Sequence, residues 1–253
     1  MKNNHFLGGV AVVCLIVSGC VSTTQSTPNV EPVKPDFNKA YQDYLQLGAH
    51  YVSLGRYDLA EPKLKRAIEI DSEPPEAWNV LAVLYEEKRD IAAGNQVYQK
   101  LIASHPDYPL GFMNYATFLC KFDRDADRQN LYDKMRRKGR EFVPLSYIAA
   151  GDCERKRQQD AAAQAQYRQA LVFDNKAAGA LLPLSELAVA QHDYATALGY
   201  LKVMHTYIGY SPESVRLAIL AARGTNDRVL EEEMMRIMRG NYGDTPQAKS
   251  LGI

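Results

Sequence analysis

Apolar residues recur three and four positions apart along the chain after residue 40, with turn residues between the runs, and this spacing predicts amphipathic helices. Two consecutive stretches show the same order of residue types. The first contains Tyr44, Leu47, Gly48, Tyr51, Ala60, Leu64, Ala67 and Pro74. The second begins 34 residues further on and contains Trp78, Leu81, Ala82, Tyr85, Gly94, Tyr98, Leu101 and Pro106. The chain is therefore built from a repeated helical unit.

A period of 34 residues with this order of aromatic, small and aliphatic residues is that of the tetratricopeptide repeat. Each unit is a pair of antiparallel helices, and small residues such as Gly48 and Ala60 lie where the two backbones approach closely. Ala82 and Gly94 take the same places in the second unit. Because one unit cannot bury its apolar face alone, units stack into a superhelix with a concave surface. The sequence therefore predicts an all-α tetratricopeptide-repeat superhelix of about six helix-turn-helix units.

Extending the 34-residue frame divides a domain at 37–253 into successive units. The units lie near 41–74, 75–108, 109–143, 144–177, 178–211 and 212–245. The later units follow the pattern less closely. Terminal repeats of a solenoid drift in this way, because one of their faces meets water rather than a neighbour.

The amino terminus has the composition of a secretory signal. Lys2 precedes an apolar run at 6–17 that is too short to span a bilayer. The run ends in Val17-Ser18-Gly19-Cys20, which resembles the bacterial lipobox, in which the cysteine is lipidated and becomes the mature N-terminus. We therefore predict a signal peptide at 1–19 and lipidation of Cys20. The alternative is an ordinary signal peptide in which this cysteine is incidental.

The segment at 20–36 is rich in Ser, Thr and Pro and poor in apolar residues, so it is predicted to be a lipidated flexible tether. Residue 21 is Val rather than Asp, which resembles the sorting preference of outer-membrane lipoproteins. The expected location is therefore the outer membrane, with the protein held by its N-terminal lipid and facing the periplasm. A lipoprotein anchor carries more than the single acyl chain that gives only marginal attachment.

Two cysteines, Cys120 and Cys153, remain in the predicted mature domain. They occupy nearly equivalent positions near the ends of the first helices of units three and four. First helices of adjacent units pack side by side and the periplasm is oxidising, so we predict a disulfide between them. The alternative is a pair of buried free thiols that act as small hydrophobic groups.

Little in the sequence indicates chemistry. The formal net charge is zero, which disfavours a nucleic-acid partner. No catalytic cluster, phosphate-binding loop or metal-ligand spacing is present, so we expect no enzyme, cofactor, metal or small-molecule substrate. The basic run at 134–140 suits a nucleic-acid or lipid-headgroup patch, but it also suits a solvated helix end. The second interpretation is favoured, because cations oppose the negative end of the helix dipole.

The concave face is the remaining candidate for function. In this repeat family it is lined by fixed positions of each first helix. In the first two units the predicted groove residues are Gln42, Leu45, Ala49, Val52, Asn79 and Val83. An apolar groove with a polar rim suits an amphipathic or extended peptide. The alternative is that these residues pack against the tether or against one another.

Three segments of the chain resemble one family. They are the junction of the first two units, the stretch Met113-Asn114-Tyr115-Ala116-Thr117-Phe118-Leu119-Cys120, and the tail at 228–251. They resemble the type IV pilus biogenesis and stability lipoproteins (PilF/PilW), which share an N-Y-G-x-F-L-C signature and a second cysteine in unit four. The chain departs from that family at Ala116, where Gly is usual, and at 121–123, where the family has a Gly-containing turn.

The resemblance implies a pilotin. Such proteins bind subunits of the pilus secretin and promote their delivery to the outer membrane and their assembly into a multimeric ring. By this resemblance the secretin contact would lie in the groove of the first two units. Two other classes stay open: a scaffold of another envelope machine, such as barrel assembly, and an enzyme or enzyme activator of the peptidoglycan machinery.

Overall fold

The computed structural model describes residues 36–253. The predicted signal peptide, Cys20 and the tether up to residue 35 lie outside the described residues. In the described part the helices are α1 (Phe37–Ser53), α2 (Tyr57–Ile70), α3 (Pro75–Glu87), α4 (Ile91–Ser104), α5 (Pro109–Lys121), α6 (Asp125–Lys138), α7 (Phe142–Lys156), α8 (Asp160–Phe173), α9 (Ala178–Ala190), α10 (Tyr194–Tyr207), α11 (Pro212–Thr225), α12 (Arg228–Tyr242) and α13 (Pro246–Ser250).

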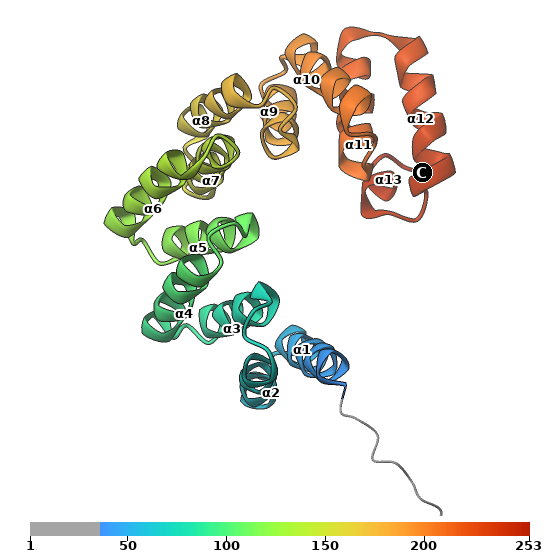
Figure 1. Ribbon diagram of the computed structural model, residues 1–253. Helices are drawn as coiled ribbons and strands as arrows, with labels where there is room; N and C mark the ends of the chain where they lie inside the picture. The colour runs from blue at the N-terminus through green and yellow to red at the C-terminus, as the bar shows by residue number, and fades with distance from the viewer. Residues whose placement is uncertain (1–35) are drawn as a thin grey trace, which may run out of the picture. The chain divides into compact units, whose positions relative to one another are not determined.

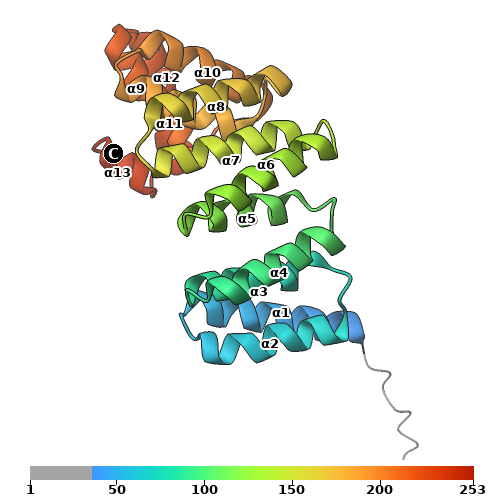
Figure 2. The same cartoon turned by 90° about the vertical axis from the view of Figure 1, so that its left-hand side faces the viewer.

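Helices α1 to α12 form six consecutive hairpins, and the short α13 packs against α11 and α12. Figures 1 and 2 show the hairpins following one another in chain order. The first helices of neighbouring hairpins also contact each other, as in α1 with α3 and α3 with α5. The prediction of an all-α tetratricopeptide superhelix is therefore confirmed. The frame is offset in two places, since α1 begins at Phe37 rather than at 41 and α7 begins at Phe142 rather than at 144.

The small residues of the repeat lie where the two helices of a hairpin meet. A Cβ added to Gly48 of α1 would lie 2.6 Å from Cδ2 of Leu64 on α2. A Cβ on Gly151 of α7 would lie equally close, 2.6 Å, to the ring of Tyr167 on α8. Both distances are well below van der Waals contact, so a larger residue at either place would push the two helices apart. The expectation of close backbone approach at Gly48 is thus confirmed.

The turn inside each hairpin contains one residue in the left-handed region. Gly55 has φ 69° in the first hairpin. The later hairpins place Arg89, Asp123, Gln158, His192 and Asn226 in this conformation, with φ between 51° and 60°. Asp123 stands in the segment where the related family has a Gly-containing turn. The turn keeps its geometry without glycine, because Asp tolerates the left-handed region better than most residues do.

The core runs along the stack as a series of clusters rather than as one central body. The largest cluster lies in the second to fourth hairpins and is rich in aromatic side chains. In it Phe112 packs edge-on against Phe142, with ring centroids 5.1 Å apart, and Tyr98 packs against Phe118 at 5.2 Å. Each cluster is made by neighbouring hairpins, as expected for a repeat protein. No helix among residues 36–253 is long and apolar enough to cross a bilayer.

Candidate functional site

The predicted groove residues on α1 are not all free to meet a partner. Gln42 is exposed, whereas Leu45, Ala49 and Val52 are half-buried. The side chains of Leu45 and Val52 pack against the buried cluster that contains Leu81 of α3. These two residues therefore contribute to packing between the first two hairpins in addition to any contact with a partner.

The groove residues on α3 include a buried polar side chain. Asn79 is only 8% exposed, and its Oδ1 accepts a hydrogen bond of 2.9 Å from Nδ2 of Asn114 on α5. Val83, one turn further along α3, is half-buried. The Asn79–Asn114 bond joins the first helices of two hairpins. Because a buried amide needs such a partner, Asn79 serves first to set the spacing of α3 and α5.

Glu86 and Lys121 continue this polar connection toward the other end of α3. A carboxylate oxygen of Glu86 accepts from Nζ of Lys121 at 3.0 Å and the other from the hydroxyl of Tyr98 at 3.3 Å. Burial opposes the charge of Lys121, but its bonds to Glu87 and Glu86 outweigh this effect and raise its pKa. Burial, and then the charge of Glu86, raise the pKa of Tyr98. On this side of the stack the polar side chains of α3 and α5 therefore bond to one another.

A similar ion pair joins α7 to α9. Nη1 of Arg155 lies 2.6 Å from a carboxylate oxygen of Glu186, and both side chains are partly exposed. The predicted groove thus has a half-buried apolar part on α1 and polar connections further along the first helices. A peptide that binds there must fit this change from apolar to polar surface.

Several hollows in the described residues lie outside the predicted groove, and two of them have mixed apolar and charged linings. The α2–α4 hollow, of about 350 Å³, is lined by Lys65, Ile68, Glu69, Trp78, Leu81, Tyr85, Gln96, Val97 and Lys100. In it, Nζ of Lys100 lies 4.2 Å above the ring of Trp78, a distance suited to a cation–π interaction. Trp78 and Leu81 lie on a different side of α3 from Asn79, so this hollow is distinct from the predicted groove.

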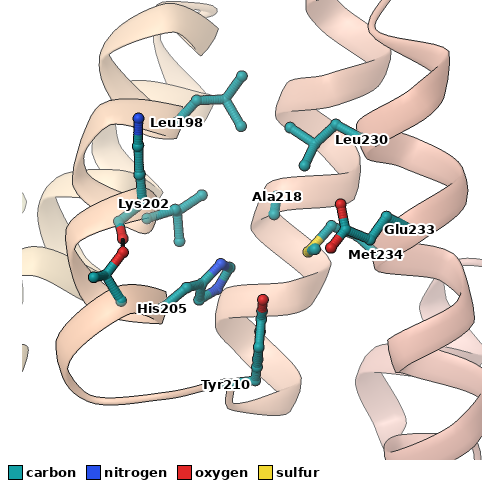
Figure 3. Close-up of a pocket in the computed structure, with 10 residues that line it drawn as sticks. Leu198, Lys202, His205, Tyr210, Ala218, Leu230, Glu233 and Met234 are labelled. Carbon is teal, nitrogen blue, oxygen red and sulfur yellow. Dashed lines mark hydrogen bonds between the residues drawn. The ribbon is translucent and has the colours of Figure 1, made fainter.

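The C-terminal pocket, of about 410 Å³, lies between α10, α11 and α12 (Figure 3). Its residues are Leu198, Leu201, Lys202, His205, Thr206, Tyr210, Ala218, Leu230, Glu233 and Met234. The His205 ring lies 4.4 Å from that of Tyr210, and its Nε2 is 3.1 Å from Oγ of Ser214. Burial lowers the pKa of His205, which favours the neutral imidazole at neutral pH.

The sequence pattern did not predict the C-terminal pocket. The bond between His205 and Ser214 helps to fix the start of α11. The lining residues come from α10, α11, α12 and the link before α11, and they share no motif in the sequence. Only the packing of these helices brings them together.

The structure joins Cys120 on α5 to Cys153 on α7 by a disulfide, with the two Cα atoms 5.7 Å apart. Both cysteines are nearly fully buried. The guanidinium of Arg128 on α6 contacts the sulfur of Cys153 and bonds to Asp125 at 3.0 Å. The bridge therefore lies inside the stack, between the third and fourth hairpins.

The segment at 114–120 that carries the family resemblance has a contact for nearly every side chain. The hydroxyl of Tyr115 donates to Oδ1 of Asn95 at 2.6 Å. Phe118 is fully buried, and its ring would lie 2.8 Å from a Cβ at position 94, where the chain has Gly94. Together with the Asn114 bond and the cysteine bridge, these contacts tie α5 to α3, α4 and α7. The residues that carry the family resemblance therefore pack the third hairpin against its neighbours.

Within residues 36–253 no group of three or more His, Cys, Asp or Glu side chains is arranged to hold a metal ion. The fold is one that typically serves protein interaction.

Comparison with known proteins supports this description. The family model of the tetratricopeptide repeat matches residues 44–74. The type IV pilus assembly protein PilF of Pseudomonas aeruginosa is 24% identical over 230 residues, which cover 87% of this chain and 86% of PilF. This chain is a PilF/PilW-like tetratricopeptide-repeat protein. The family resemblance expected from the sequence is therefore confirmed.

The solved structures agree in fold. The structure of Pseudomonas aeruginosa PilF matches with a TM-score of 0.50 at 20% identity, over 86% of this chain and 99% of that one. PilW, described as a widely conserved type IV pilus biogenesis factor, matches with a TM-score of 0.55 at 18% identity, over 85% and 100%. Yeast Tom70 gives a TM-score of 0.63 at 13% identity but matches along only 45% of its own length. Similarity of fold therefore does not select a function by itself.

Proposed function

We propose that this chain is a type IV pilus biogenesis factor of the pilotin class. In this proposal it is anchored to the outer membrane by lipid at Cys20 and faces the periplasm. It binds pilus secretin subunits and promotes their localisation and their assembly into multimers. The observation that carries the proposal is the similarity to PilF, a type IV pilus assembly protein, along 87% of this chain and 86% of PilF.

The shared length matters because short matches are common among tetratricopeptide proteins. A match confined to one or two repeats would indicate only the fold. Here the similarity extends through the divergent later hairpins, and the structure superposes on the whole of PilW. The predicted signal peptide, lipidation of Cys20 and tether are consistent with such a role.

The test uses a deletion strain that is complemented with the wild-type chain or with the Cys20→Ser variant. The two membranes are fractionated, run without boiling and blotted for the pilus secretin. We expect heat-resistant secretin multimers to disappear from the outer membrane in the deletion strain and to return with the wild-type chain only. Multimers at the wild-type level in the deletion strain would refute the proposal. Crosslinking would then identify another envelope complex, such as barrel assembly or the peptidoglycan machinery.

The position of the secretin contact can be tested in the same strain. We place it on the predicted groove, and Gln42 and Ala49 are suitable test positions because Leu45 and Val52 also pack against the buried cluster of α2 and α3. Gln42→Arg combined with Ala49→Arg should reduce recovery of the secretin with the purified protein. Asp58→Arg on α2, where the side chain is 69% exposed, is the control. Equal secretin recovery with both variants would exclude the groove.

A further inference from the structure

The stack of hairpins has two edges of different composition. Because the helices of each hairpin are antiparallel, the links between hairpins lie on the edge where α1 begins, here called the tether edge. Figure 2 shows the link from α2 to α3 on the side where α1 begins. The opposite edge, here called the turn edge, carries the turns within hairpins. The tether edge has five links, at 71–74, 105–108, 139–141, 174–177 and 208–211.

Exposed apolar side chains are concentrated on the tether edge. The large apolar residues exposed there are Phe37, Leu110, Val172, Phe173, Tyr207, Ile208 and Tyr210. The turn edge has Leu54, Ile91 and Val229, while Leu47 lies within α1. Single exposed apolar residues need no explanation, but a group gathered at neighbouring links indicates an interaction surface.

Rings and cations connect the third, fourth and fifth links. Cζ of Arg136 lies 5.1 Å from the ring centroid of Tyr147, which stacks on Phe173 with centroids 5.7 Å apart. Lys176 lies in the fourth link, and Tyr207 ends α10 just before the fifth. Nζ of Lys176 lies 4.0 Å above the ring of Tyr207, which is 60% exposed. These five residues, here called the aromatic edge, form two neighbouring groups of rings and cations, one at Arg136, Tyr147 and Phe173 and one at Lys176 and Tyr207.

Exposed cationic side chains lie at the third link and at the end of α6 just before it. In the run at 134–140, Lys138 pairs with Asp107 at 2.7 Å and Arg136 with Asp133 at 3.0 Å. No ion pair recorded within residues 36–253 includes Lys134, Arg137 or Arg140, and all three residues are exposed. The first link is acidic instead, with Asp71 and Glu73. The basic part of the edge is therefore restricted to the third link and its neighbours.

We propose that the aromatic edge, together with Lys134, Arg137 and Arg140, rests on the surface of an anionic phospholipid bilayer. Tyrosine rings and the stems of lysine and arginine suit the headgroup region, because each combines an apolar body with a polar tip. Exposed cations next to them are attracted to anionic headgroups. The whole chain has zero formal charge, so the attraction is local to this edge.

The position of α1 strengthens this assignment. The chain enters the described unit at Asp36, which caps α1 on the tether edge. If a lipid is attached upstream, as proposed above, the chain that carries it joins the folded unit on this edge. The sequence alone favoured a solvated helix end for residues 134–140. The structure favours the surface role instead, because the ring beside Arg136, that of Tyr147, stacks on the exposed ring of Phe173.

The test measures the depth of single tryptophans in the full lipidated protein reconstituted in vesicles. Trp78→Phe removes the natural tryptophan, and Tyr207→Trp or Val229→Trp then places a reporter on the tether edge or the turn edge. Vesicles contain brominated phosphatidylcholine with or without phosphatidylglycerol. We expect strong quenching of the reporter at 207 with phosphatidylglycerol and weak quenching at 229. Helicity and thermal unfolding of each variant establish that the fold is kept.

The charge requirement is tested with Arg137→Gln combined with Arg140→Gln, and with the exposed Arg228→Gln and Arg236→Gln on α12 as the matched control. Each cation lost from the surface weakens its attraction about fivefold, so the first pair should reduce docking of the edge roughly thirtyfold. High salt should act in the same direction.

Equal quenching at 207 and 229, or quenching at 207 that is unchanged by the Arg137 and Arg140 substitutions, would overturn the proposal. If the reporter at 207 responds only when secretin subunits are added, the edge is a protein interface and the proposal is wrong. Failure of the anchor itself would be seen separately, as protein that lacks the acyl mass and does not enter the vesicles.

Discussion

The first two hairpins and the last two hairpins are built differently from the same repeat. In the first two, consensus residues such as Ala60, Leu64 and Ala82 are completely buried. In the last two, Leu201 and Ala218 are also buried, yet they line a pocket of about 410 Å³ that is open beside α12. Consensus residues therefore specify close packing inside a hairpin. Both regions leave a hollow at the surface, of about 350 Å³ at Trp78 and Leu81 and of about 410 Å³ beside α12, and they differ in the helices that line it.

The disulfide lies between these two regions, and its loss should have the largest effect on stability. In the chain-entropy model, a bridge that closes a loop of this length contributes about 3 to 4 kcal/mol. Cys120→Ser combined with Cys153→Ser should lower the thermal unfolding midpoint, and reduction of the wild-type chain should lower it similarly. Alkylation without reductant checks the starting state. Modification of both thiols in the protein isolated without reductant would contradict the bridge.

The contrast in packing can be tested with one substitution in each region. Ala82→Val adds two methyl groups at a fully buried position on α3 and should destabilise by about 1 to 3 kcal/mol, because overpacked cores are strained. Ala218→Val places the same groups at the wall of the C-terminal pocket (Figure 3) and should be neutral or stabilise by up to about 1 kcal/mol. Urea unfolding of both variants compares them. Equal destabilisation would show that the two regions are packed alike.

The smallest expected effect is electrostatic and belongs to the first two hairpins. Lys65 and Lys88 lie 2.8 Å and 2.9 Å from Glu61 of α2, and the hydroxyl of Tyr85 donates to it at 2.9 Å. The bond from Lys65, then that from Lys88, lower the pKa of Glu61 to about 2, against the opposing effect of burial.

A lowered folded-state pKa contributes stability above the unfolded-state value of 4.5, and this contribution is lost as the pH falls toward about 2. Glu61→Gln should therefore destabilise by about 1 kcal/mol at pH 7, after allowance for solvent screening. Thermal unfolding of both proteins between pH 7 and pH 2 should show the difference shrinking in acid. A difference that is constant with pH would assign the effect of Glu61 to packing instead.

The predicted groove illustrates how far position in a repeat can predict a site. The 34-residue repeat frame predicts that Asn79 and Val83 lie on one side of α3. It does not predict whether that side is accessible to a partner. Asn79 is buried by its bond to Asn114, a residue 35 positions away. Leu45 and Val52 were chosen for their apolar character, and the same character draws them into the contact with α3. The identity of the secretin as partner and the lipid at Cys20 stay predictions.

The repeat period determined the helices, their pairing and the close approach at Gly48, because these depend on residues that are near in sequence and recur at fixed spacing. The tertiary structure alone decided which surfaces are open. The C-terminal pocket and the aromatic edge join residues from helices and links that are far apart in sequence. Their positions depend on how each hairpin is rotated against the next, and this rotation is set by the sum of many side-chain contacts between hairpins.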